Sequence, residues 1–412
     1  MFYKCRIKLA NNKYFSFSIL KPDHFPEMAL KKPLRSFTTN DWLRIWVLSI
    51  LLFLGFLFNN NTNFVLPGEE GLATKMDVLT EMILPSSFHP PHDFVFINTG
   101  KDLELVKDEN GGDNVITDRA KLGSLLKLLA DSNRHSFLLC DIVFDLPSPE
   151  DSVFREDIKG LQKALFPRHT GDTANLFTGF SLPEAYADYY TNTGKFSKFR
   201  LINGDSDKTL PLVLYEKMQG VRSEKKFGFL VCNNKICFQT ISPAFYIRPY
   251  HLNVSKTYPC FNLGELLLLS ADPSFYGQFL ANRFIVIGNF DTDVHATPVG
   301  SMPGTLILLN TYLGLVNGLN QPGILWFLFM FIVFFLINLH LIHGEISPPR
   351  IGKKSWWSKI LNNLLVRLFS LGFLCLGIDL LSQYIFGVRC QLLSIVFFIL
   401  VANFLLDLSR PN

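Results

Sequence analysis

Residues 136–145 read SFLLCDIVFD, an apolar run that ends in an aspartate and is followed at once by Leu-Pro-Ser-Pro. A short apolar run bounded by turn residues is typical of a strand buried on both faces, as in a parallel sheet. We therefore predict a buried strand over residues 136–144. Asp141 and Asp145 lie in and just after this strand, and their spacing of four places them on one side of an extended chain.

The flanking segments alternate between strand and helix patterns. Residues 94–97 form another buried apolar run, and after a polar loop a Leu-rich helix begins at Thr117 or Asp118. We further predict a helix at 151–165, strands at 174–180, 199–202 and 284–288, a hairpin within 227–241, and a helix at 303–316. Parallel strands joined by helices need both sheet faces covered, so the prediction is a three-layer α/β domain with a mostly parallel sheet and an inserted hairpin.

Four apolar runs flank this domain and have about the length of membrane-spanning helices. They cover residues 42–58, 324–343, 360–381 and 391–408. We interpret the first as a retained anchor and not a signal peptide, because the segment before it is too long and no small-residue cleavage site follows it. The prediction is four transmembrane helices, one N-terminal and three C-terminal.

Basic residues set the expected orientation of these spans. Segment 1–41 and loop 344–359 both carry Lys and Arg close to a span, and Arg44 lies at the start of the first one. Positively charged flanks tend to stay in the cytoplasm. We therefore expect both termini and the loop in the cytoplasm and residues 59–323 outside it.

Polar side chains inside the predicted spans form one group of candidates. Arg367 and Asp379 lie in the third span, and Asn403 and Asp407 lie in the fourth. Ionisable groups at membrane depth are functional candidates that face a partner helix or an ion or proton path. The plainer interpretation, which we favour for Arg367, is a long side chain that reaches the interface.

A second group lies where predicted parallel strands end. Asp293 and His295 follow the strand at 284–288, and Asp141 and Asp145 follow the strand at 136–144. Ligands of such folds bind at the carboxyl ends of the strands, so these side chains could converge with Asp118 and Arg119 on a polar ligand or a metal. The alternative is that the aspartates end strands and cap helices, and that Arg119 forms an ion pair with one of them.

Several classes of function are disfavoured by the sequence. A net charge of +4 in a chain whose basic residues cluster beside apolar runs gives no reason to expect nucleic-acid binding. Seven scattered cysteines show no zinc spacing, and no nucleophile elbow, phosphate loop or Rossmann glycine pattern is present. We expect no metal, no cofactor and no enzymatic activity. Cys232 and Cys237 flank a predicted turn, either as a disulfide or as two buried thiols.

The middle of the chain resembles the CHASE family of extracellular sensory domains, specifically its second type, found in bacterial receptors. The likeness covers most of residues 90–320 and is strongest in Phe284-Ile-Val-Ile-Gly288 and Asp293-Val-His-Ala-Thr-Pro-Val-Gly300, which adds Thr297 to the candidates. It extends to one span before the sensor and three after it. Asn98-Thr-Gly100 stands where family members often carry an acidic pair.

The resemblance implies a bacterial inner-membrane protein with a periplasmic sensor. Such proteins usually continue into a cytoplasmic effector, whereas here we expect none, because the sequence ends at Asn412 just after the fourth span. The predicted function is a sensory or scaffold subunit that binds a small ligand or an extracytoplasmic protein and couples through its helices, within the lipid bilayer, to another membrane protein subunit. The alternatives are a membrane-anchored metal-dependent hydrolase and an accessory subunit of an ion- or proton-conducting complex.

Overall fold

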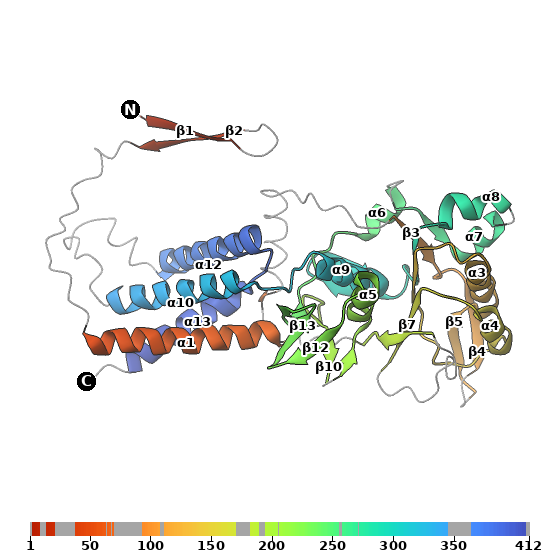
Figure 1. Ribbon diagram of the computed structural model, residues 1–412, viewed down its shortest axis with the longest axis horizontal. Coiled ribbons are helices and arrows are strands. Elements are labelled where there is room, and N and C mark those ends of the chain that lie inside the picture. Colours follow the sequence, from red (N-terminus) through yellow and green to blue (C-terminus); the bar gives the residue numbers. More distant parts are fainter. Residues whose placement is uncertain are drawn as a thin grey trace. The chain divides into compact units, whose positions relative to one another are not determined.

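The structure is a computed structural model of the chain (Figure 1). It describes residues 2–8, 14–20, 38–62, 64–66, 68–69, 93–107, 111–169, 182–188, 194–204, 206–254, 258–270, 272–344 and 364–408. The chain divides into two units, Met1–Arg44 and Ile45–Asn412. In the first unit, β1 (Phe2–Lys8) and β2 (Tyr14–Leu20) pair as antiparallel strands.

The second unit contains a six-stranded parallel sheet, as predicted in outline. Its strands lie in the order β16-β3-β17-β6-β7-β8. Their bounds are β3 (Phe94–Asn98), β6 (Phe137–Asp141), β7 (Ala164–Arg168), β8 (Glu184–Tyr186), β16 (Cys260–Asn262) and β17 (Phe284–Gly288). The three central strands are fully or almost fully buried, which explains their continuous apolar sequences.

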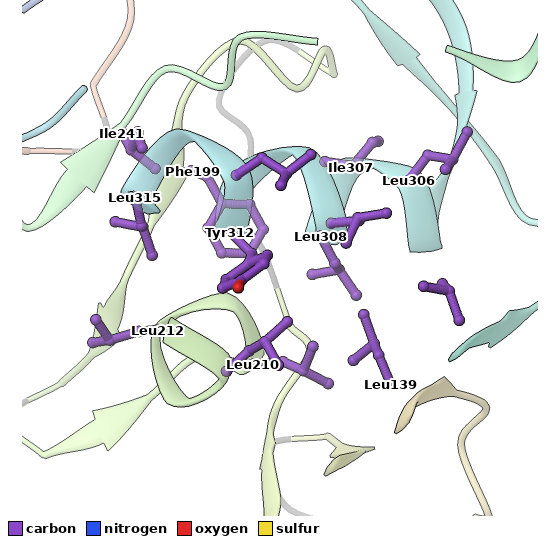
Figure 2. Close-up of a cluster of buried hydrophobic side chains, with 14 of the residues drawn as sticks. Leu139, Phe199, Leu210, Leu212, Ile241, Leu306, Ile307, Leu308, Tyr312 and Leu315 are labelled. Carbon is purple, nitrogen blue, oxygen red and sulfur yellow. The ribbon is translucent and has the colours of Figure 1, made fainter. Parts of the chain in front are cut away.

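Helices bury both faces of this sheet, so the fold is a mixed α/β arrangement. One face packs against α3 (Arg119–Ser132), α4 (Asp151–Asp157) and α7 (Leu263–Leu269). The other packs against α5 (Leu210–Gln219) and α9 (Gly304–Val316). Figure 2 shows Tyr312 of α9 pointing toward Leu210 of α5 in this second core. Alternate residues of each strand enter opposite cores, as the pleat requires.

Three sequence predictions for this domain were wrong in detail. The polar loop before α3 contains an antiparallel hairpin of β4 (Leu103–Lys107) and β5 (Asp113–Thr117). The helix predicted at 151–165 ends at Asp157, because the chain turns back into β7. The strand predicted at 199–202 divides into β9 (Phe199–Arg200) and β10 (Ile202–Asn203), both outside the main sheet. The strand predicted at 174–180 lies outside the described residues.

Smaller elements complete the domain. The predicted hairpin is part of a three-stranded antiparallel sheet of β12 (Ser223–Lys226), β13 (Phe229–Cys232) and β14 (Lys235–Cys237). β18 (Val294–Thr297) and β19 (Gly300–Pro303) form a second hairpin. The remainder are β11 (Asp207–Lys208), β15 (Thr240–Ile241), α6 (Pro249–Val254), α8 (Pro273–Phe275) and a π-helical turn at Tyr276–Leu280.

Four apolar helices overlap the four runs predicted as spans: α1 (Thr39–Asn61), α10 (Ile324–Gly344), α12 (Leu364–Phe386) and α13 (Leu392–Leu408). Within the described residues, two stretches are long and apolar enough to cross a membrane, Thr39–Asn61 and Ile324–Ile342, which is fewer than the four predicted. The four helices share a core. Hydrogen bonds join Asn338 to Ser49 at 2.9 Å and the Trp326 indole to Ser382 at 2.7 Å.

The last turn of α1 is hydrogen bonded to the α/β domain. Lys198 Nζ donates to the Asn59 carbonyl at 2.8 Å, and Thr240 Oγ1 donates to the Asn60 carbonyl at 2.6 Å. Helix ends leave carbonyls without partners in the helix, and these two donors satisfy two of them. The Gln239 amide completes the set by donating to the Asn61 side chain at 2.7 Å. We call this set the α1 junction: Asn59, Asn60, Asn61, Lys198, Gln239 and Thr240.

Candidate functional site

A cavity of about 550 Å³ lies at the carboxyl ends of several parallel strands. Its polar lining comes from the loops after β6, β7, β8 and β17. Its apolar wall includes Leu103 and Val115 of the β4–β5 hairpin. We call it the acidic cavity, because its titratable lining consists of four carboxylic acids and two imidazoles: Asp141, Asp145, Asp188, Asp293, His169 and His295.

Asp141 is the carboxylate best fixed by its surroundings. It is the last residue of β6, and its Oδ2 accepts a hydrogen bond from Thr305 Oγ1 at 2.8 Å. Thr305 lies in the first turn of α9 and is fully buried. Burial raises the pKa of Asp141 to about 7, although the Thr305 hydrogen bond acts in the opposite direction. This carboxyl group therefore changes charge near neutral pH.

Gly288 makes room for the Thr305–Asp141 contact. A Cβ atom added at Gly288 would lie 2.0 Å from Thr305 Oγ1 and 2.9 Å from Thr305 Cβ. Gly288 is the last residue of strand β17, and it is needed because α9 approaches the sheet closely at that point.

Two imidazole–carboxylate pairs line the cavity. His295 Nε2 lies 2.8 Å from Asp293 Oδ1, and His169 Nδ1 lies 2.6 Å from Asp188 Oδ1. The His295 ring also meets the Phe196 ring edge to face, with centroids 5.1 Å apart. Each pair fixes the direction of its imidazole ring. In the part of the chain that the structure describes, no group of three or more potential metal ligands comes together.

The structure brings together four of the residues proposed from sequence: Asp141, Asp145, Asp293 and His295. Asp118 instead caps α3, accepting from the Lys121 amide at 3.0 Å. Arg119 is buried with its guanidinium 4.2 Å from the centre of the Phe144 ring and 3.8 Å from Asp151. The Asp118 cap is the kind of contact that the alternative interpretation describes, whereas the acid nearest to Arg119 is Asp151, which was not among the candidates.

Thr297 and the end of the first strand have structural contacts as well. Thr297 Oγ1 donates to the Gly300 carbonyl at 2.6 Å within the β18–β19 turn. The Asn98 side chain donates to Asp291 Oδ2 at 2.9 Å and accepts from the Gly100 and Phe290 amides at 2.9 and 3.1 Å. Asn98 thus holds the loops after β3 and β17 together.

Sequence reasoning missed four residues of the site: His169, Asp188, Asn289 and Thr305. His169 follows β7, whose first two residues lay within the helix predicted at 151–165, and Asp188 follows β8, which we had not predicted. Asn289 comes directly after β17, so the rule that found Asp293 could have found it too. Thr305 is brought to Asp141 by the packing of α9 on the sheet, and no local sequence pattern signals that contact.

The remaining candidates lie away from the cavity. Asp379 of α12 is buried and accepts from the Cys390 amide at 2.8 Å and from Gln383 at 2.6 Å. Arg367, Asn403 and Asp407 lie in α12 and α13, with their side chains outside the described part. Cys232 and Cys237 are buried free thiols, and a hydrogen bond between them together with burial raises the pKa of Cys232.

No family model matches this chain, and neither the curated proteins nor the solved structures contain a match. We therefore infer a function from the cavity and from the contacts by which α9 connects it to the apolar helices.

Proposed function

We propose that the α/β domain is a sensor of the CHASE type that binds a small organic cation in the acidic cavity and passes the binding event through α9 to the membrane helices. The observation that carries the proposal is the contact of Thr305, at the start of α9, with Asp141 on the cavity wall. Only residues 317–323 separate the end of α9 from the start of α10.

The charge of the cavity favours a cationic ligand. Four carboxylic acids outnumber two imidazoles, so acids remain in excess even if both imidazoles are protonated. A cation placed among carboxylates gains charge-assisted hydrogen bonds, which are about twice as strong as neutral ones. Leu103, Val115 and Leu308 provide apolar wall beside these acids. An alkyl ammonium compound, with a charged end and a hydrocarbon part, matches both surfaces.

Helix α9 offers a physical route out of the cavity. It is buried from Gly304 to Leu315 and is closely packed on the sheet, so a displacement of its first turn would displace the whole helix. The segment after it is fixed to Phe238, because Asn320 and Phe238 exchange hydrogen bonds at 3.1 and 2.8 Å. The Phe238 ring in turn packs 5.6 Å from the Trp326 ring of α10. A shift of Thr305 thus has a contiguous packed path to α10.

The proposal includes the membrane arrangement expected from the sequence. α1, α10, α12 and α13 would all span the inner membrane of a bacterium, with residues 59–323 in the periplasm and both termini in the cytoplasm. The shared core of the four helices supports a single bundle. The outer surface of that bundle would contact lipid and a second membrane protein, to which the signal passes. The chain itself is proposed to be non-enzymatic.

Binding to the full-length chain in nanodiscs tests the proposal. Putrescine, spermidine and choline are titrated by calorimetry against the wild-type chain and against Asp145→Asn and Asp293→Asn. We expect at least one amine to bind and each variant to weaken it about tenfold or more, since a hydrogen bond to a charged group contributes about 1.5–3 kcal/mol. The matched control is Asp118→Asn, which changes an aspartate outside the cavity and should leave affinity unchanged.

Three results would count against a cation sensor. The first is that none of the three amines binds, and the second is that the control weakens binding as much as the cavity variants do. The third is binding of Mg²⁺ or Zn²⁺ alone that is lost in Asp293→Asn, which would favour the metal-dependent hydrolase instead.

A further inference from the structure

The hairpin between β12 and β13 carries an unusual residue at its tip. Lys226 pairs with Phe229 across the ladder, so Phe227 and Gly228 form a two-residue turn. Their φ angles of 50° and 79° are both positive. Turns of this kind strongly favour asparagine, aspartate and glycine, since a bulky side chain is strained at positive φ.

The adjacent hairpin in the same small sheet provides an internal comparison. Asn233 and Asn234 form the β13–β14 turn with φ angles of 48° and 63°, and asparagine is one of the favoured residues there. The same backbone geometry thus occurs twice within a few residues, once with a residue suited to it and once with phenylalanine. The phenyl ring of Phe227 gains nothing from the fold in return, because it is fully exposed. The presence of phenylalanine at this turn position therefore needs an explanation outside the domain.

The position of this turn points to the reason. The Gly228 carbonyl accepts hydrogen bonds from the side chains of Asn61, the last residue of α1, and Gln239. The Phe229 ring lies 6.4 Å from the Phe327 ring near the start of α10. Phe227 therefore sits at the level where two helices of membrane-spanning length end. A single exposed apolar side chain is common on protein surfaces, but this one lies beside the ends of two helices that are long and apolar enough to span a membrane.

The exposed residues around Phe227 are mostly basic. Arg222, Lys225 and Lys226 are exposed on or beside β12, with Glu224 as the one acid of that strand. Lys226 forms an ion pair with Glu224 at 2.7 Å, and Lys225 donates to the Gly204 carbonyl at 3.3 Å. Three basic residues against one acid still leave this surface with a net positive charge. Basic residues near a bilayer surface are attracted to anionic headgroups, and an aromatic ring suits the interface between headgroups and acyl chains.

We propose that the β12–β13 tip is a lipid-binding finger: Phe227 inserts into the outer surface of the bilayer, while Lys225 and Lys226 bind anionic headgroups. The inference rests on the proposed membrane arrangement of α1 and α10. Its occupant is lipid and not a protein partner, because the tip is fixed to the ends of the spanning helices themselves. The finger would hold the domain at a fixed height above the membrane.

Photocrosslinking of the full-length chain tests this inference. p-Benzoylphenylalanine replaces Phe227 in one variant, Leu54 in a second and Leu105 in a third. Leu54 is an exposed residue of α1, and Leu105 is an exposed residue of the β4–β5 hairpin beside the acidic cavity. Each variant is illuminated in nanodiscs of phosphatidylcholine and phosphatidylglycerol, and lipid adducts are measured by mass spectrometry. We expect adducts at 54 and 227 and none at 105.

The adducts at positions 54 and 227 distinguish the lipid-binding finger from the proposed membrane arrangement of α1. Adducts at 54 without adducts at 227 would overturn the finger and leave the spanning helices in place. An absence of adducts at both positions would overturn both, and equal adducts at 105 and 227 would show unspecific labelling and overturn the finger.

Two further variants test the chemistry of the finger. With the crosslinker at 227, the share of phosphatidylglycerol among the adducts should exceed its share of the lipid, and Lys225→Gln with Lys226→Gln should remove the excess. No excess in the parent variant would overturn the electrostatic part. Phe227→Asn places a favoured turn residue at the tip, so the chain should remain at least as stable to heat in detergent. A clear loss of stability would mean that Phe227 serves the fold, contrary to the inference.

Discussion

The acidic cavity and the α1 junction both concentrate polar groups, but the partners of these groups differ between the two regions. In the junction, donors and acceptors point at one another, and three hydrogen bonds of 2.6–2.8 Å close the end of a helix. In the cavity, carboxylates from several loops face a shared open space. Burial moves the pKa of Lys198 in the junction down to about 7 and that of Asp141 in the cavity up to about 7. The junction therefore satisfies its polar groups within the chain, whereas the cavity leaves several carboxylates around an open space.

The largest effect is expected from closing the space under the cavity. Gly288→Val should lower the free energy of unfolding by about 3 kcal/mol, because overpacking a tight core costs that much and the first added atom already lies 2.0 Å from Thr305 Oγ1. The measurement is denaturant unfolding of the detergent-solubilised chain. Amine binding should weaken as well, since Thr305 can no longer reach Asp141.

A second glycine provides the control for this substitution. A Cβ atom at Gly277 meets nothing within 4 Å, so Gly277→Val should change stability much less. Thr305→Ala removes the atom nearest to position 288 and should restore part of the stability lost in Gly288→Val. Equal losses at 277 and 288 would contradict the close-approach explanation.

Asp141→Asn should make the protein more stable at neutral and alkaline pH. Below pH 4 both the folded and the unfolded chain hold this proton, so the substitution changes little. Between the ordinary pKa of 3.8 and the folded pKa of about 7, the folded chain binds more protons, and wild-type stability falls as pH rises. Asparagine removes this penalty, so its stability gain over wild type should grow by about 1.4 kcal/mol per pH unit within this window.

Unfolding of wild type and Asp141→Asn at pH 4.5, 6 and 8 measures this effect. The gain of the variant should grow with pH and level off above pH 7. A gain that does not depend on pH would mean that the carboxyl group pays no burial penalty in the folded chain. Asp141→Asn should also bind amines more weakly. The ionised carboxyl group would then lower the stability of the fold while it contributes to binding.

The junction should show the opposite dependence on pH. The pKa of Lys198 is lowered by burial from 10.5 to about 7, so between these values the unfolded chain binds more protons and stability rises with pH. Relative to Lys198→Met, the wild type should gain about 2.3 kcal/mol between pH 7 and pH 9. Lys208→Met is the matched control, because it removes a lysine that forms an ion pair with Glu216 at 2.6 Å outside the junction. A slope of equal size in both comparisons would remove Lys198 as its source.

The contrast between the two regions also explains what could be predicted from sequence. The buried strands β3, β6 and β17 are continuous apolar runs, and the rule that ligands bind at carboxyl edges then located Asp141, Asp145, Asp293 and His295. His169 obeys the same rule, but β7 contains Pro167 and begins within residues that also fit a helix. Because the helix predicted at 151–165 covered the start of β7 and no strand was predicted there, the carboxyl end of β7 could not be found.

The α1 junction was beyond sequence reasoning for a different reason. Lys198 and Thr240 lie far along the chain from Asn59 and Asn60, and they meet only because β9 and β15 pair beside the end of α1. Contacts of this kind depend on tertiary packing and leave no periodic pattern. Residues at the carboxyl edge of a sheet are located by topology, whereas residues that connect the end of a helix to a neighbouring domain are not.

The smallest predicted effect concerns Asp118, an aspartate outside the cavity whose carboxylate already has hydrogen-bond and ion-pair partners. Asp118 was grouped with the cavity from sequence, yet its side chain accepts from the Lys121 amide at the start of α3 and lies 3.3 Å from Lys121 Nζ. Asp118→Ala should therefore cost about 1 kcal/mol of stability, the usual value for a lost helix cap, while Asp118→Asn should cost only a few tenths because asparagine caps almost as well. Neither should alter amine affinity, measured in the same titrations. If Asp118→Asn weakened amine binding while leaving stability intact, Asp118 would belong with the cavity aspartates, and hydrogen-bond satisfaction would fail as the criterion that divides the two regions.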